Sequence, residues 1–78
     1  MLFERIQDII VDQLGVSIDE ITVETQILGH KKVDSLELFL ILHRIEDEFD
    51  IKFEIDIMQH ITTVGDVVES TQNCINNK

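Results

Sequence analysis

The chain has 78 residues, which is enough for one domain with a small core, so we expect a single domain over residues 1–78. Its 44% hydrophobic content exceeds what a disordered acidic segment contains. Sixteen acidic residues against six basic ones give a formal net charge of −10. Such a surface repels nucleic acid phosphates and attracts basic patches on proteins, so we expect protein partners and no nucleic acid.

Several features predict a cytoplasmic protein without membrane insertion. No segment approaches the roughly 20 apolar residues that cross a bilayer, and the start "MLFERIQDII" lacks a signal-peptide pattern. The single cysteine, Cys74, cannot form an internal disulfide, which fits a reducing compartment.

The first predicted element is an amphipathic helix over residues 2–14. Its apolar residues with helical spacing are Phe3, Ile6, Ile10 and Leu14. Gly15 follows directly and can end a helix in a left-handed conformation. Residues 16–33 lack a sustained period and predict a long loop, which in so small a domain suggests function. The side chains expected to attach this loop to the core are Ile18, Ile21, Val23, Ile27 and Leu28.

The second predicted helix runs from Ser35 to about Phe49. Its expected core stripe is Leu38, Leu42, Ile45 and Phe49. Residues 50–61 alternate like a strand, but no second strand-like run could pair with them. A loop and a short helical turn around residues 56–60 are therefore expected instead.

The last predicted helix begins after Thr63, a good N-cap residue, with Asp66 in its first turn. Its expected buried side is Val64, Val67, Val68, Thr71 and Ile75. The predicted fold is all-α: a small four-helix bundle of three main helices and one short helix, with a long loop between helices one and two.

The stretch "VDSLE", residues 33–37, lies where the long loop meets the second helix. Asp34 followed by Glu37 is typical of a capping box, which explains both acids and gives Ser35 no special role. However, a serine in the first turn lies beside unpaired N–H groups at the positive end of the helix dipole. A phosphate ester would be stabilised there.

Residues 33–54, "VDSLELFLILHRIEDEFDIKFE", resemble the modification site and second helix of acyl carrier proteins. In that family Asp-Ser-Leu begins the helix and a Glu-[Glu/Asp]-Glu-Phe run ends it. The resemblance extends through "IIVDQLGV" at 9–16 and "HITTVGDVVE" at 60–69. It implies a four-helix bundle that is not an enzyme and carries acyl groups as thioesters, in fatty acid biosynthesis or a related specialised acyl or polyketide pathway.

The resemblance also implies a cofactor and partners. Ser35 would be esterified with 4′-phosphopantetheine, donated by coenzyme A through a separate phosphopantetheinyl transferase, with Asp34 and Leu36 beside it. Asp34 would orient the serine and contact the metal site of the transferase. Acyl-processing enzymes with basic patches would then dock on the second helix, and a carrier that visits many enzymes is expected to be a monomer.

Two further surfaces follow from this resemblance. The predicted docking residues are Glu37, Leu40, His43, Glu46, Asp47 and Glu48. The residues predicted to line a pocket for the acyl chain are Phe39, Phe53, Met58 and Ile61, although core packing explains each equally well.

The loop before the serine departs from the family pattern. There His30-Lys31-Lys32-Val33 replaces the usual Asp-Leu-Gly and small residue, which predicts the loss of a packed anchor and of a flexible turn. The two lysines place positive charge beside the attachment point. Alternatives therefore stay open: a peptidyl or aminoacyl carrier, or a small acidic helical adaptor without a prosthetic group.

A metal site is not expected, because the spacing of the three histidines and Cys74 matches no ligand motif.

Overall fold

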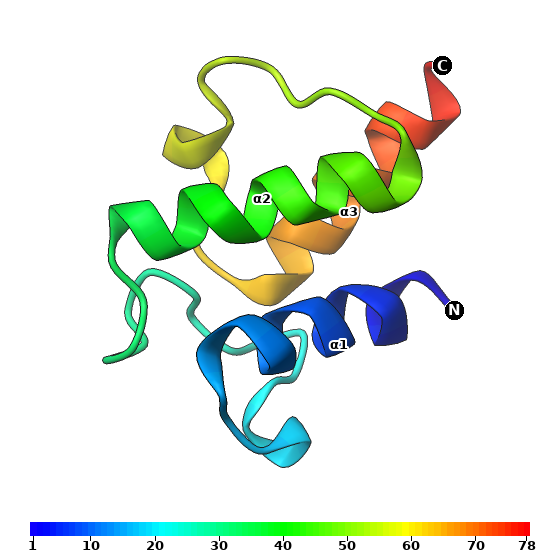
Figure 1. The fold of residues 1–78 in the computed structure, drawn as a ribbon. Helices are drawn as coiled ribbons and strands as arrows, with labels where there is room; N and C mark the ends of the chain where they lie inside the picture. The colour runs from blue at the N-terminus through cyan, green and yellow to red at the C-terminus, as the bar shows by residue number, and fades with distance from the viewer.

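The computed structural model describes residues 1–78 and contains three α-helices and two short 3₁₀ helices. The α-helices are α1 (Leu2–Leu14), α2 (Ser35–Phe49) and α3 (Val64–Asn76), and the 3₁₀ helices are η1 (Ile18–Glu20) and η2 (Ile57–His60). Figure 1 shows α1 alongside α2, with α3 crossing behind α2. The all-α prediction is confirmed, and the expected short fourth helix is the 3₁₀ turn η2.

The ends of the helices follow from local sequence. Gly15 ends α1 in the left-handed conformation, with φ of 68°, and its N–H donates to the carbonyl of Val11. Thr63 caps α3, as the sequence indicates, and the Asp66 carboxylate accepts the N–H of Thr63 in return, which completes a capping box. At the end of α2 the left-handed residue is Asp50, with φ of 55°, which the sequence did not reveal.

The core is built mainly from isoleucine, leucine and valine side chains of all three helices. Its buried members are Ile6, Ile10, Ile21, Ile27, Val33, Leu38, Ile41, Leu42, Ile45, Ile51, Ile61, Val64 and Val67. On α2 the predicted stripe omitted Ile41, which is fully buried, and included Phe49, which is only half-buried. On α3, Thr71 is fully buried, and its hydroxyl is satisfied by donating to the carbonyl of Val67 at 2.7 Å.

The long loop between α1 and α2 is attached differently from the prediction. Ile21 and Ile27 are buried, but Ile18, Val23 and Leu28 are each exposed by more than two fifths. Backbone hydrogen bonds replace those three anchors, because the loop pairs with the segment that enters α3. The N–H of Ile27 donates to the carbonyl of Thr62 at 2.9 Å, and the loop carbonyls of Thr25 and Val23 each accept an N–H from the start of α3.

The alternating segment after α2 forms no strand. It runs as a loop over residues 51–56 into η2, as the lack of a pairing partner predicted. Ile51 reaches the core, whereas Ile55 is fully exposed, so the alternation does not correspond to one buried face. None of the helices has the length and apolarity that a membrane span requires.

Candidate functional site at the N-terminus of α2

Ser35 is the first residue of α2 and is exposed to solvent. The carboxylate of Asp34 accepts the N–H of Glu37 at 2.8 Å, and its carbonyl accepts the N–H of Leu38 at 3.0 Å. The N–H groups of Ser35 and Leu36 have no acceptor in the protein. The first turn therefore leaves two donors, at the positive end of a 15-residue helix, beside the serine hydroxyl.

Only one of the two hydrogen bonds of the expected capping box forms at this site. Asp34 caps the helix, but the Glu37 carboxylate does not return to the N–H of Asp34. Instead it accepts a hydrogen bond from the side-chain amide of Gln13 at 3.4 Å, which links α2 to α1. A contact with another helix thus replaces the local one.

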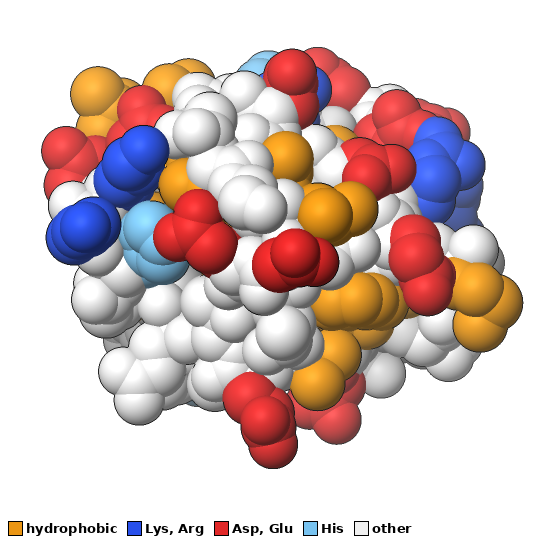
Figure 2. Space-filling view, turned by 90° about the horizontal axis from the view of Figure 1, so that it is seen from below, with side chains coloured by type: hydrophobic (Ala, Val, Ile, Leu, Met, Phe, Trp, Pro, Cys, Tyr) orange, Lys and Arg blue, Asp and Glu red, His pale blue; other side chains and the backbone are white.

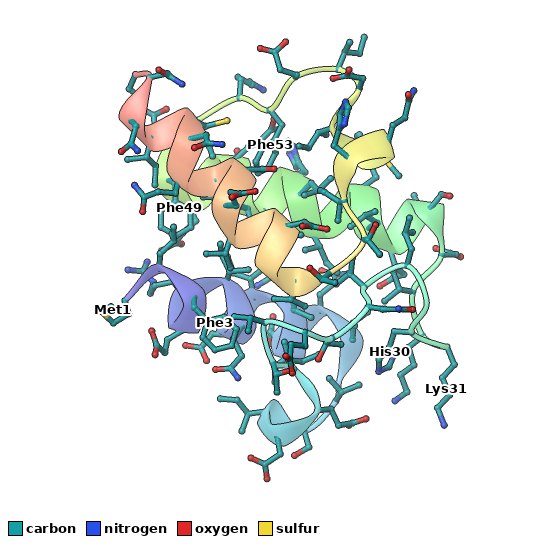
Figure 3. All side chains as sticks on the ribbon, turned by 180° about the vertical axis from the view of Figure 1, so that it is seen from behind. Met1, Phe3, His30, Lys31, Phe49 and Phe53 are labelled. Carbon is teal, nitrogen blue, oxygen red and sulfur yellow. The ribbon has the colours of Figure 1, made fainter.

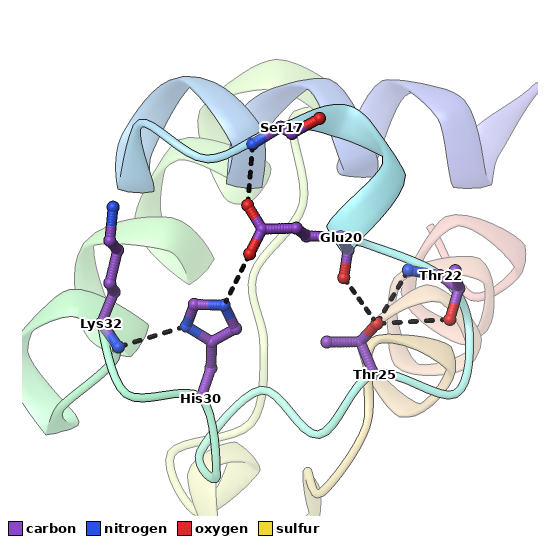
Figure 4. Close-up of polar contacts among 6 residues, drawn as sticks. All are labelled: Ser17, Glu20, Thr22, Thr25, His30 and Lys32. Atoms are coloured by element: carbon purple, nitrogen blue, oxygen red, sulfur yellow. Dashed lines mark hydrogen bonds and ion pairs between the residues drawn. The ribbon is translucent and has the colours of Figure 1, made fainter.

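The loop that leads into Ser35 is held by His30. The imidazole Nδ1 accepts the N–H of Lys32 at 3.1 Å (Figure 4). The carbonyl of His30 accepts the N–H of Val33 at 3.0 Å. The opposite ring nitrogen lies 4.0 Å from the Glu20 carboxylate, which also accepts the N–H of Ser17. Val33 is buried in the core. The predicted loss of an anchor was therefore wrong, because His30 and Val33 together fix this loop.

The outward face of α2 presents apolar side chains next to Ser35. Leu36, Phe39 and Leu40 are exposed, and the ring of Phe39 stacks on that of His43 with centroids 6.4 Å apart. Phe39, which the sequence analysis predicted to line an acyl pocket, is 57% exposed. Phe39 lines a cavity together with the buried Leu42, so it lies at the margin of the core stripe.

The acidic residues predicted for docking differ in their availability. Glu46 turns inward, because its carboxylate accepts the N–H of Phe53 at 2.8 Å and its side chain is only 16% exposed. Glu48 forms an ion pair with Arg5 of α1. Asp47 remains exposed, with its carboxylate 3.7 Å from the His43 ring. The exposed rim of this face is thus less acidic than the sequence suggested.

A cavity of about 200 Å³ opens between α2 and the segment that leads to η2. Its lining is mostly apolar and comprises Phe39, Leu42, His43, Glu46, Phe53, Glu54, Ile55, Ile57 and Met58. Three of the four residues predicted to line an acyl pocket are among them. The fourth, Ile61, is buried in the core and does not line this cavity.

A larger, more polar cavity of about 650 Å³ lies where α2 and α3 end. Cys74 contributes to its wall, and its thiol lies 3.6 Å from the carbonyl of Lys52. Burial, followed by the negative charges of Glu54 and Glu46, raises the pKa of the Cys74 thiol, so it stays protonated and poorly nucleophilic. No group of three or more histidine, cysteine or acidic side chains in the structure is arranged to hold a metal ion.

Comparison with known proteins agrees with this geometry. Residues 4–70 match the family described as a phosphopantetheine attachment site. The chain is 46% identical over 72 residues to an acyl carrier protein of Lactococcus lactis subsp. cremoris, covering 92% of this chain and 94% of the relative. It is 43% identical over 67 residues to an acyl carrier protein of Streptococcus thermophilus, covering 86% of each chain.

A more distant relative extends the same result. An acyl carrier protein of Clostridium acetobutylicum is 38% identical over 68 residues, covering 87% of this chain and 88% of the relative. The matched span covers most of α1, all of α2 and the first half of α3, with the exposed serine of α2 inside it. The chain therefore belongs to the acyl carrier protein family, whose members hold a covalently attached 4′-phosphopantetheine and act as carriers rather than enzymes.

Proposed function

We propose that this chain carries acyl intermediates as thioesters on a 4′-phosphopantetheine arm esterified to the Ser35 hydroxyl. The observation that carries the proposal is the placement of Ser35, which is exposed at the first position of α2 within the span that matches the family. The arm, when bound, supplies the thiol to which an acyl group is joined.

The residues around Ser35 fit a phosphodiester. The free N–H groups of Ser35 and Leu36 and the positive helix end favour an anion at this hydroxyl. Asp34 uses one carboxylate oxygen in the cap, which leaves the other to orient the serine or to contact the metal site of a transferase. The carboxylate of Asp34 and the imidazole of His30 are bonded to the N–H groups of Glu37 and Lys32, so we propose that the transferase supplies the base that deprotonates the Ser35 hydroxyl.

The outward face of α2 is the proposed docking surface for the transferase and the acyl-processing enzymes. Leu36, Leu40 and His43 supply its centre and Asp47 its most exposed acidic group, to which basic residues of a partner can bind. Glu37, Glu46 and Glu48 contribute less than the sequence predicts, since each is already engaged within the protein. We propose that the protein meets these enzymes in the cytoplasm as a monomer.

The small apolar cavity is the proposed site for the acyl chain, with Phe39, Phe53 and Met58 in its wall. Its mostly hydrocarbon lining suits an aliphatic cargo better than an aminoacyl group, which favours fatty acid biosynthesis or a related acyl or polyketide pathway over a peptidyl carrier. Loading of octanoyl-phosphopantetheine onto Ser35 should shift the amide signals of Phe53 and Met58. Unchanged signals would place the acyl chain in solvent.

The attachment itself is tested by the intact mass of the protein before and after incubation with coenzyme A and a broad-specificity phosphopantetheinyl transferase. We expect a gain of one phosphopantetheine in the wild type and in Ser17→Ala and Ser70→Ala, and no gain in Ser35→Ala. If no transferase modifies the wild type, the chain is instead a small acidic adaptor without a prosthetic group.

A further inference from the structure

Lys31 and Lys32 are the only lysine or arginine side chains in the structure without an acidic partner. The other four basic side chains form ion pairs: Arg5 with Glu48, Arg44 with Asp12, Lys52 with Glu46, and Lys78 with Asp50. Lys31 and Lys32 are exposed and lie next to each other in the loop before α2. On a protein of net charge −10, two unpaired positive charges make the surface potential locally more positive than elsewhere.

These two lysines are held in place by the loop described above. The hydrogen bond from the N–H of Lys32 to His30 and the burial of Val33 fix the backbone on both sides of the pair. Figure 3 shows the side chain of Lys31 extending away from the rest of the fold. Seen from the side of α1, lysine and arginine side chains lie at the left and right edges and are partly visible at the top, with acidic and apolar side chains between them (Figure 2). The lysine pair is therefore presented to whatever approaches this end of the molecule.

The distance to Ser35 determines which partner must meet this pair. Lys32 and Lys31 precede Ser35 by three and four residues, so their Cα atoms lie within about 11 and about 14 Å of that of Ser35. Enzymes that act on the thiol can remain at a distance from the serine equal to the length of the phosphopantetheine arm. The transferase, in contrast, must bring its active site onto the Ser35 oxygen, so its surface covers residues at this distance.

We infer that the transferase of this protein carries carboxylates opposite Lys31 and Lys32, in addition to the basic residues that meet α2. This inference rests on the proposed function of Ser35. A transferase with a uniformly basic surface would repel the lysine pair and leave two ammonium groups desolvated without a partner. Carboxylates at these positions remove both costs and give the transferase a way to distinguish this carrier from relatives without the lysines.

The test compares two double variants that each remove two positive charges. K31Q/K32Q removes the free pair, and K52Q/K78Q removes two lysines that are ion-paired at the other end of α2. Because the net charge is the same in both, long-range attraction to the transferase is matched. Steady-state kinetics with the transferase of the same organism would give kcat and the KM values for the carrier and for coenzyme A, at about 50 mM and about 500 mM NaCl.

At low salt we expect K31Q/K32Q to raise the KM for the carrier about five- to tenfold and to leave kcat unchanged. A rise of this size corresponds to the loss of two exposed charge pairs. K52Q/K78Q should change this KM less than about twofold, and high salt should reduce the difference. Carbodiimide, which joins amines directly to carboxylates, should cross-link Lys31 or Lys32 to acidic residues of the transferase. The cross-linked peptides would be identified by mass spectrometry.

Equal KM values for the two double variants, or a lower value for K31Q/K32Q, would overturn the inference. A rise confined to the KM for coenzyme A would also overturn it, because the lysines would then bind the phosphates of the coenzyme. Absence of transfer to the wild type would overturn the proposed function and this inference together. A failure limited to the comparison of variants would overturn the inference alone.

Discussion

Asp34, the residue that precedes Ser35, combines a structural role with a proposed chemical one. Its carboxylate caps α2 through the N–H of Glu37, which the sequence pattern predicted. The same carboxylate is exposed to an approaching transferase. Asparagine caps a helix about as well as aspartate but carries no charge, so it can separate these two roles.

We predict that Asp34→Asn folds with little loss of stability but accepts phosphopantetheine about 10- to 100-fold more slowly, as expected for a lost contact to a metal site. Asp34→Ala should in addition lose about 1 kcal/mol of unfolding free energy, because the cap is gone. Urea unfolding and the initial rate of mass gain would measure both effects. A wild-type rate in Asp34→Asn would show that the transferase does not use the carboxylate.

At the residue scale, the sequence predicted some positions of the site and missed others. Ser35 and Asp34 lie where their motif placed them, because helix caps depend on residues close in the chain. The partners of Glu37, Glu46 and Glu48 could not be predicted. Those carboxylates reach Gln13, the backbone of Phe53 and Arg5, which other segments of the chain supply.

The helix α3 depends on the capping box that joins Thr63 and Asp66. The Asp66 carboxylate accepts the N–H groups of Thr62 and Thr63 at 2.8 and 3.0 Å. The backbone hydrogen bond from Thr63, followed by that from Thr62, lowers the pKa of Asp66 from its ordinary value of 3.8. Because the folded state binds this proton more weakly than the unfolded state, ionised Asp66 stabilises the fold above pH 3.8, and this contribution is lost as the pH falls through the lowered pKa.

We predict that Asp66→Asn is less stable than the wild type at pH 7 and that the difference closes as the pH falls below about 3.8. Thermal unfolding at several pH values, followed by circular dichroism, would show this. Glu69→Gln removes an exposed acid of the same helix and serves as the control, with no loss of stability expected at any of these pH values. A stability difference independent of pH would mean that the charge of Asp66 does not contribute.

At the element scale, the three helices were predictable because each has apolar residues at helical spacing and a local signal at one or both ends. The attachment of the long loop to the core was less predictable. Ile18, Val23 and Leu28 are as apolar as Ile21 and Ile27, yet they stay exposed, because backbone pairing with residues 62–65 decides which side chains turn inward. Hydropathy carries no information about that pairing, nor about the single turn η1.

For the whole molecule, the excess of negative charge opposes folding. Only four lysine and arginine side chains are paired with acids, so most of the sixteen acidic residues repel one another across a small surface. The net charge was evident from the sequence. Its distribution was not, since the isolation of Lys31 and Lys32 depends on which bases find partners in the folded chain.

We predict that raising NaCl from about 20 mM to about 500 mM stabilises the protein by on the order of 1 kcal/mol, seen as a rise in Tm of about 4–8 °C. Screening of like charges is the cause. The variant Glu24→Gln/Glu69→Gln, which lacks two exposed acids, should show a higher Tm at low salt and a smaller rise. A Tm that stays constant or falls with salt would contradict this.

The most direct measurement is fragmentation mass spectrometry of the protein purified from its own cells. We predict that the peptide containing Ser35 carries phosphopantetheine and releases the pantetheine portion on fragmentation, with no such release from peptides that contain Ser17 or Ser70. A native protein whose Ser35 is unmodified, or an arm found on another serine, would contradict the assignment of the carrier site to the start of α2.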